Sequence, residues 1–244
     1  MSQIQVEEAS GQRARVAWCG YRRWSERLLA LARAGGKAEI VACLTEPAAF
    51  TDFMSTNPEI DIIVLAGWSW KIPEEIVRRY PCIGLHPSDL PKYRGGSPLQ
   101  HQILDGLVET KCSLFQLAPE LDVGPVLAKT RMSLAGNMSD IFDELVRAGS
   151  ELLDRAFSEW PHWHPQEQDF SAGFTCKRRR PEEGRLQPMA FQTVPLVDLY
   201  NIIRALGDPY PNAYIEDDEG NRLLFKEVAY ISASADTISG KGVK

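Results

Sequence analysis

No apolar run in the sequence approaches the roughly 20 residues that a helix needs to cross a bilayer. The first residues, MSQIQVEEASGQRA, also lack the apolar core of a signal peptide. The five cysteines are scattered and form no C-x-x-C pair, so neither a disulfide framework nor a zinc site is indicated. These absences favour a cytoplasmic protein with reduced, mostly buried cysteines.

An excess of positive charge is missing as well. The formal net charge is -6 at pH 7, which gives no electrostatic basis for sequence-independent binding to nucleic acid or to an anionic membrane. No G-x-G-x-x-G fingerprint follows the first strand pattern, so a nicotinamide cofactor is not indicated. What is present is a 244-residue chain with 44% hydrophobic residues, long enough for one α/β domain and a small appendage.

Apolar runs alternate with helical patterns over the first 160 residues. Strands are expected at residues 15–18, 38–44, 61–67, 82–85, 112–117 and 126–130, and helices at 25–34, 97–105 and 138–160. The run at 61–67 is apolar throughout, as a strand covered on both faces would be. The alternation predicts an α/β protein with a doubly wound, mostly parallel, Rossmann-like sheet.

The residue composition of the chain changes after Trp160. Residues 161–188 are rich in Pro, Gln and Arg and predict a long surface-crossing loop. A helix at 197–205 and a hairpin with strands at 213–216 and 223–226 are then expected. We therefore expect a flexible leader at 1–14, a catalytic domain with its loop at 15–188, a small appendage at 189–232 and a frayed tail at 233–244.

One histidine directly follows a predicted buried strand. His86 opens the Pro- and Gly-stiffened run HPSDLPKYRGGSP, and the carboxyl ends of strands are where ligands bind in open α/β sheets. Later in the chain, Asp122 precedes a Gly-Pro turn in the run LDVGP. Taken singly, such a histidine is more often a packed or surface residue, and such an aspartate a turn former. Together they indicate a reacting centre at which His86 and Asp122 meet.

These two runs, together with WSWKIP at 68–73, resemble the folate-dependent formyltransferases, and most of all the sugar N-formyltransferases. The resemblance implies transfer of a formyl group from 10-formyltetrahydrofolate to the amine of a small acceptor, with a nucleotide-linked amino sugar as the first expectation. It implies that His86 stabilises the oxyanion while Asp122 orients the imidazole and helps to remove the amine proton. The C-terminal appendage resembles an element that supports dimerisation, so a homodimer is expected.

The resemblance also assigns binding residues. Trp68, Trp70, Ile72, Leu121, Val123 and Gly124 would bind the folate, although the aromatic residues among them could equally fill a core. Arg94, Gly95, Gly96, Ser97, Lys177 and Arg178 would bind the acceptor. The basic run that starts at Lys177 suits a phosphate, but charge runs are often simply solvated. His162 and His164 lack a third ligand at a sensible spacing, so no metal is expected.

One position departs from the family pattern. The family has Asn two residues before the histidine, where it donates to the oxyanion, and Gly84 stands there in this sequence. Loss of one such donor can cost about 3 kcal/mol of transition-state stabilisation, so Ser88, Gln100 and Gln102 are candidates for a replacement. Asp89 is either a second acid or a turn cap. The departure also keeps open a formyltetrahydrofolate hydrolase, or a folate or sugar-nucleotide binding protein without turnover.

Overall fold

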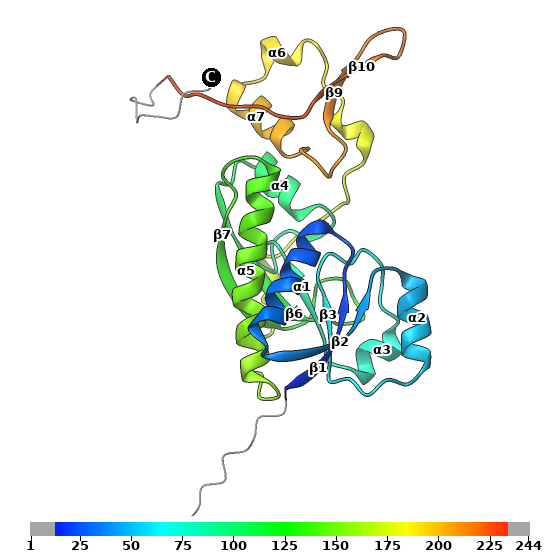
Figure 1. Ribbon diagram of the computed structural model, residues 1–244. Coiled ribbons are helices and arrows are strands. Elements are labelled where there is room, and N and C mark those ends of the chain that lie inside the picture. Colours follow the sequence, from blue (N-terminus) through cyan, green and yellow to red (C-terminus); the bar gives the residue numbers. More distant parts are fainter. Residues whose placement is uncertain (1–12, 234–244) are drawn as a thin grey trace, which may run out of the picture.

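The computed structural model describes residues 13–233, so the expected leader and frayed tail lie almost wholly outside the described residues. Its centre is a six-stranded sheet with the order β2-β1-β3-β4-β6-β7 (Figure 1). The strands are β1 Ala14–Cys19, β2 Ala38–Leu44, β3 Ile62–Leu65, β4 Cys82–His86, β6 Glu109–Gln116 and β7 Val126–Ser133. The pairings from β2 to β4 are parallel, and those of β4 with β6 and β6 with β7 are antiparallel. The predicted mostly parallel α/β sheet is confirmed.

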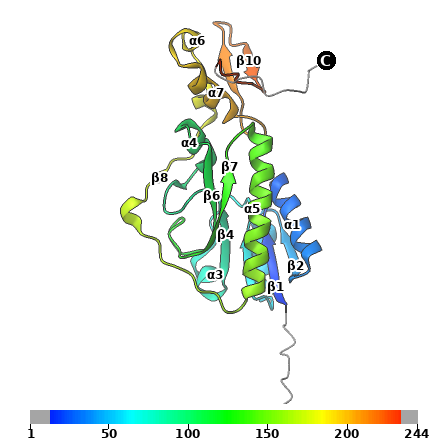
Figure 2. The ribbon, with the colours of Figure 1, turned by 90° about the vertical axis from the view of Figure 1, so that its left-hand side faces the viewer.

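Helices cover both faces of this sheet (Figures 1 and 2). On one face lie α1 Arg23–Gly35 and α5 Met138–Glu159, and on the other lie α2 Pro47–Ser55 and α3 Glu74–Arg79. Side chains of a strand alternate between faces, so Val16 and Trp18 of β1 pack in the α1–α5 core, whereas Ala17 and Cys19 pack in the α2–α3 core. Double coverage explains why these strands are apolar throughout.

The predicted helix at 138–160 is α5, and its start is fixed by a capping box. The Asn137 side chain accepts from the Asp140 backbone N–H at 3.1 Å, and the Asp140 carboxylate accepts from the Asn137 N–H at 2.9 Å. The helix at 97–105 is α4, Pro98–Leu104. The short helices α2 and α3 carry little buried surface, and α3 has no buried residue, so their sequence pattern is weak.

The long loop at 161–188 runs back across the sheet edge instead of standing free in solvent. Its Gln166 pairs with Val126 at the start of β7, and β8 Thr175–Cys176 pairs in parallel with β5 Arg94–Gly95. Two 3₁₀ turns, Phe170–Ala172 and Pro181–Gly184, lie along the same segment. The loop is therefore attached to the segment that follows His86 in the sequence.

The C-terminal unit comprises α6 Ala190–Thr193, α7 Leu196–Arg204, β9 Ala213–Glu216 and β10 Arg222–Phe225. It has a small core of its own that includes Leu199, Ile203 and Ala213. The buried Arg204 links it to the sheet domain, because its guanidinium donates to the backbone carbonyls of Leu134 at 2.6 Å and Gly136 at 3.0 Å. The predicted helix and hairpin are both present.

Within residues 13–233, no helix is both long enough and apolar enough to cross a bilayer. All five cysteines are free thiols, and Cys19, Cys82 and Cys112 are buried. Burial raises the pKa of the Cys82 and Cys112 thiols to about 12.

Candidate active site

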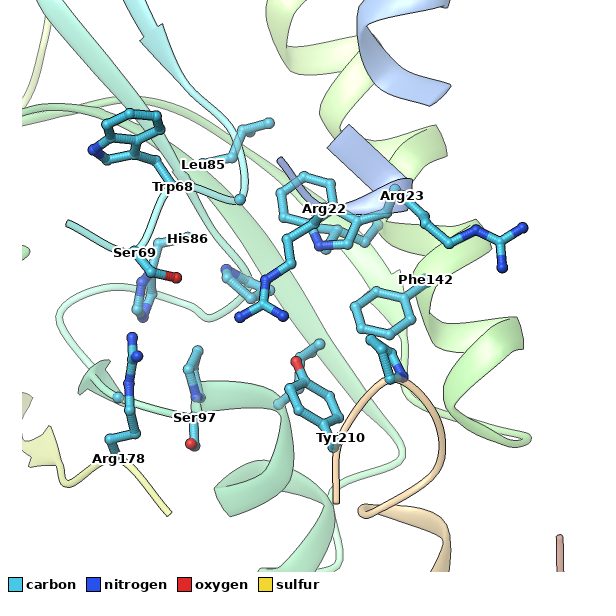
Figure 3. A pocket seen from close by; sticks show the side chains of 18 of the residues that line it. Arg22, Arg23, Trp68, Ser69, Leu85, His86, Ser97, Phe142, Arg178 and Tyr210 are labelled. Carbon is cyan, nitrogen blue, oxygen red and sulfur yellow. The ribbon is translucent and has the colours of Figure 1, made fainter. Parts of the chain in front are cut away.

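A cavity of about 640 Å³ opens at the carboxyl ends of β1, β3 and β4 (Figure 3). The chain goes from β1 outward to β2 and then returns to β3 on the other side of β1, so the strand order reverses between β1 and β3. Such a reversal leaves a crevice between the loops that follow the two strands. The turn after β1 is tight, because a Cβ atom at Gly20 would lie 2.1 Å from the Ala66 carbonyl oxygen. His86 ends β4 and lines this cavity.

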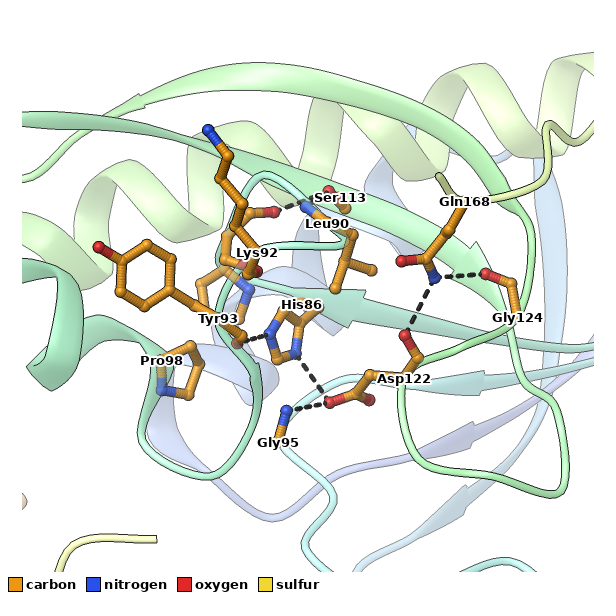
Figure 4. Close-up of polar contacts among 12 residues, drawn as sticks. His86, Leu90, Lys92, Tyr93, Gly95, Pro98, Ser113, Asp122, Gly124 and Gln168 are labelled. Carbon is orange, nitrogen blue, oxygen red and sulfur yellow. Dashed lines mark hydrogen bonds and ion pairs between the residues drawn. The ribbon is translucent and has the colours of Figure 1, made fainter. Parts of the chain in front are cut away.

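His86 and Asp122 meet, although 35 residues separate them in the sequence (Figure 4). His86 Nδ1 lies 3.5 Å from Asp122 Oδ2, and His86 Nε2 lies 2.8 Å from the Tyr93 carbonyl oxygen. The two side chains are 8% and 12% exposed. Both ring nitrogens face acceptors, and only the imidazolium form has a donor for each of them. These two contacts fix the orientation of the ring beside the cavity.

Hydrogen bonds hold both the side chain and the backbone of Asp122. Its Oδ2 atom accepts from the Gly95 N–H at 2.7 Å, and the residue has a φ of 54°, in the left-handed region. Gln168 from the long loop donates to the carbonyls of Asp122 at 3.0 Å and Gly124 at 2.7 Å. A Cβ atom at Gly124 would lie 1.9 Å from the Gln116 carbonyl oxygen, so this turn requires glycine. Asp122 is thus held before any ligand arrives.

The three residues proposed from the sequence as replacement oxyanion donors lie around the loop that follows His86. Ser88 is fully buried, and its hydroxyl donates to the Lys92 carbonyl at 2.7 Å. The Gln102 amide nitrogen donates to the carbonyls of Pro87 and Pro98, at 2.8 and 3.0 Å. Both side chains therefore hold the loop closed. Gln100 is buried beside Tyr210.

The position two residues before His86 faces an aromatic ring. Gly84 of β4 is the direct cross-strand partner of Phe115 in β6. A Cβ atom at Gly84 would lie 3.1 Å from both the Phe115 ring and the Leu117 side chain. Phe115 also lies edge-on to the His86 ring, with 6.5 Å between centroids. The space of the family asparagine is therefore filled by apolar side chains.

Three of the residues assigned to the folate, Trp68, Trp70 and Ile72, lie in the segment that follows β3. Trp68 packs against Phe50 and Trp70, with centroid distances of 6.0 and 4.9 Å, and it lines the cavity. Its buried indole N–H has no hydrogen-bond partner among the described residues. Ile72 lies beneath in the core, while Trp70 is 41% exposed. An unpartnered donor beside aromatic surface fits a flat heterocycle that carries acceptors.

The other three folate candidates are on the turn that carries Asp122. Leu121 is 70% exposed, Val123 is half-buried and Gly124 is buried. Leu121 is an exposed apolar side chain next to the catalytic candidate, available to cover a ligand. Gly124 has no space for a side chain, so only its backbone could contact a ligand.

Four of the six acceptor candidates line the cavity, namely Gly95, Gly96, Ser97 and Arg178. Lys177 and Arg94 do not: the Lys177 carbonyl lies 2.9 Å from His101 Nε2, and the Arg94 guanidinium lies 4.7 Å from the Phe170 ring centroid. The cavity also contains Arg22 and Tyr210, which sequence reasoning did not single out. The available signal for Arg22 was its place just after the first strand, at the end of the sheet where ligands bind.

Asp89 is engaged by two lysines on the sheet. Its carboxylate lies 2.6 Å from Lys129 Nζ and 3.1 Å from Lys111 Nζ. Burial raises the pKa of Asp89, but the hydrogen bonds from the two lysines outweigh this, and the net shift is downward. These contacts support the structural role of Asp89. No group of three or more His, Cys, Asp or Glu side chains that could hold a metal occurs within residues 13–233.

Comparisons with known proteins extend these observations. The family model described as formyl transferase matches residues 28–153, about half of the chain. A methionyl-tRNA formyltransferase of Sulfurimonas denitrificans is 30% identical over 188 residues, which are 76% of this chain and 59% of that protein. The chain thus spans about three-fifths of the length of that relative.

Two solved structures show the same fold. A methionyl-tRNA formyltransferase from Clostridium thermocellum superposes with a TM-score of 0.78 at 26% identity, covering 91% of this chain and 95% of that one. A sugar N-formyltransferase from Shewanella sp. superposes with a TM-score of 0.69 at 15% identity, covering 90% of this chain and 99% of that one. The family uses 10-formyltetrahydrofolate as its formyl donor. The chain belongs to the formyl transferase family.

Proposed function

We propose that this protein transfers the formyl group of 10-formyltetrahydrofolate to the primary amine of a small acceptor, an amino sugar linked to a nucleotide. The observation that carries the proposal is the His86–Asp122 pair, 3.5 Å apart, of which His86 lines the cavity at the carboxyl end of the sheet. Family membership supports the reaction class, and the cavity supports an acceptor that enters between the sheet and the C-terminal unit.

The reaction needs one group that stabilises negative charge on the formyl oxygen and one group that removes a proton from the amine. As the amine attacks the formyl carbon, a new C–N bond forms and negative charge develops on the carbonyl oxygen. His86 stabilises this oxyanion, and Asp122 keeps the ring oriented. Asp122 also takes part in removing one proton from the amine. That proton is finally delivered to N10 as the bond between N10 and the formyl carbon breaks, so that atoms and charge balance.

The chain's own residues account for folate binding in this proposal. When bound, 10-formyltetrahydrofolate supplies an activated formyl group on N10. Trp68 would offer its unpartnered indole N–H and aromatic surface, and the exposed Leu121 would cover the ring from the turn that carries Asp122. Ile72 fills the core below. This arrangement would place the formyl carbon between the aromatic group and His86.

The acceptor is argued from charge and from the cavity. A chain with a formal net charge of -6 has no general attraction for a polyanion such as tRNA. Asp208, Pro209 and Tyr210 from the C-terminal unit line the cavity together with Gly95 and Ser97, so this unit bounds the site. A small acceptor fits a site that the C-terminal unit bounds on one side.

Methionyl-tRNA is a second candidate acceptor. The relative from Sulfurimonas denitrificans and the structure from Clostridium thermocellum both carry the name methionyl-tRNA formyltransferase. An RNA acceptor would need its 3′ end in the same cavity, with most of its contacts outside it. An activity assay that includes both acceptor classes separates the two candidates.

The test mixes the purified full chain with 10-formyltetrahydrofolate in two series of reactions. One series contains nucleotide-linked amino sugars and the other contains methionyl-tRNA. Release of tetrahydrofolate is followed by absorbance and each acceptor by mass spectrometry. A formylated amino sugar supports the proposal, and formylation of methionyl-tRNA alone would replace the acceptor. Formate release without any acceptor indicates a hydrolase. Folate binding without turnover in every arm overturns the catalytic proposal and leaves a binding protein.

A further inference from the structure

Two guanidinium groups extend into the cavity from different parts of the chain. Arg22 lies directly before α1, and Arg178 lies in the long loop just after β8. Figure 3 shows both side chains reaching into the cavity, with Ser69, Ser97 and His86 around them. The sequence separates the two arginines by more than 150 residues, so their convergence is a product of the fold.

Neither arginine has an acidic partner within residues 13–233. Two other arginines that line the cavity do: Arg27 lies 2.6 Å from an Asp143 oxygen, and Arg179 lies 3.5 Å from a Glu183 oxygen. The Arg22 guanidinium lies 4.6 Å from the Tyr21 ring centroid. Among the described residues, two guanidinium groups on the cavity wall therefore lack an ion-pair partner, although Asp143, which pairs with Arg27, and Asp208 also line the cavity.

The Tyr210 hydroxyl lies close enough to feel both charges. Burial raises the pKa of Tyr210, and the Gln100 amide, Arg22 and Arg178 each act to lower it. Figure 3 shows the hydroxyl turned toward Arg22. In addition, α1 begins directly after Arg22, so the positive end of its dipole faces the same cavity. The two guanidinium groups, the Tyr210 hydroxyl and the start of α1 would all favour an anion in this part of the cavity.

We propose that Arg22 and Arg178, with the Tyr210 hydroxyl, bind a phosphate or diphosphate group of the acceptor and so hold its amine toward His86. Guanidinium groups bind phosphate oxygens with two parallel hydrogen bonds, and two of them match the double charge of a diphosphate bridge. The inference rests on the proposed function and adds the acceptor's anionic group to it. A nucleotide-linked sugar and the 3′ end of an RNA both carry this chemistry.

Binding is measured by calorimetry on the full chain without folate, so that the result does not depend on turnover. The probes are inorganic pyrophosphate, a nucleoside diphosphate and a short RNA that ends in CCA. Arg22→Gln and Arg178→Gln are expected to raise the Kd of the bound probe at least about tenfold each, since each removes a bidentate charged contact. Binding of the nucleoside diphosphate identifies a small acceptor, and binding of the RNA alone identifies an RNA acceptor.

Matched controls remove the same charge elsewhere. Arg33 is an exposed arginine in the last turn of α1, and Arg180 is an exposed neighbour of Arg178; neither lines the cavity. Arg33→Gln and Arg180→Gln should change the Kd by no more than about twofold at moderate salt, where distant charges are screened. Equal losses in tests and controls, or no binding of any phosphate probe to the wild type, overturn the inference.

The inference and the proposed function fail in different ways. Phosphate binding that depends on both arginines, with no formylation of any amine, leaves the subsite standing and removes the proposed function. Formyl transfer in which Arg22→Gln and Arg178→Gln leave the acceptor KM unchanged keeps the function and removes the subsite. The expected pattern is an acceptor KM raised at least about tenfold with a smaller change in kcat, as for groups that bind ground and transition state alike.

Discussion

Gly84 and Phe115 lie directly opposite each other across β4 and β6, and the phenyl ring occupies the space into which a side chain at residue 84 would extend. A chain that binds folate through the family's asparagine would need that space open. Here the wall beside His86 is apolar, and the glycine and the phenylalanine depend on each other. A side chain at residue 84 would therefore need the Phe115 ring to shift.

Gly84→Asn is expected to destabilise the protein by about 1–3 kcal/mol, because it overpacks a filled site. In a Phe115→Ala background the same change should cost less, since the ring that it meets is gone. Urea unfolding of the four proteins in this cycle measures the coupling. An identical cost in both backgrounds would show that the two residues are independent.

His86→Asn and Asp122→Asn should each lower turnover at least about a hundredfold while the protein stays folded, as expected for groups that act in the transition state. Circular dichroism and the unfolding midpoint check the fold. Asp89→Asn is the control, because Asp89 is engaged by lysines on the sheet and should keep activity within a few-fold. Near-normal rates for folded His86→Asn or Asp122→Asn would contradict the assignment.

Trp68→Phe separates folding from folate binding. The indole N–H has no partner among the described residues, so its removal should leave the free energy of unfolding unchanged within about 0.5 kcal/mol. If the N–H donates to the folate ring, affinity for 10-formyltetrahydrofolate should fall about five- to tenfold. Fluorescence titration provides the affinity. Unchanged affinity would place the folate elsewhere.

Asp89 gives the protein an acid-dependent stability. Its pKa is lowered in the folded state, so its contribution is full above the ordinary carboxyl pKa and is lost as pH falls through the folded value. Asp89→Asn should therefore cost up to about 1 kcal/mol near pH 7, and the difference from the wild type should begin to shrink below about pH 4 and vanish below the folded pKa of Asp89. Unfolding curves at several pH values test this. A difference that is constant with pH would exclude the ionic explanation.

Arg204→Gln should loosen the attachment of the C-terminal unit. The change leaves the Leu134 and Gly136 carbonyls without their buried donor, at a cost of about 2–4 kcal/mol. Hydrogen exchange in α7 should speed up more than exchange in β1 or β3. Arg222→Gln, on an exposed ion pair with Glu216, is the control and should change little.

Much of the sheet domain could be predicted from the sequence. The strand at 38–44 matches β2 in both bounds, and the long helix matches α5 within one residue, because burial on one or both faces leaves a clear apolar pattern. The meeting of His86 and Asp122 was also expected, since each residue directly precedes a run rich in Gly and Pro. Short elements such as α3, which buries nothing, leave no such pattern.

Contacts between distant segments were not predictable. Nothing in the local sequence shows that Arg22, Arg178 and Tyr210 share a cavity, because only the tertiary fold brings them together. The same limit applies to Ser88 and Gln102. Their polar groups were reasonable donors for a ligand, but the fold turns them onto backbone carbonyls of the loop.

The pairing of β8 with β5 connects the segment that carries Arg178 to the segment that holds the Asp122 carboxylate. Gly95 of β5 donates to the Asp122 carboxylate and pairs with Cys176, two residues before Arg178. A ligand that draws Arg178 inward would pull on the strand that holds the carboxylate beside His86. Recognition of the acceptor's anionic end and alignment of the reacting pair would then be one mechanical event, and a molecule with an amine but no anion would meet a less well-aligned centre.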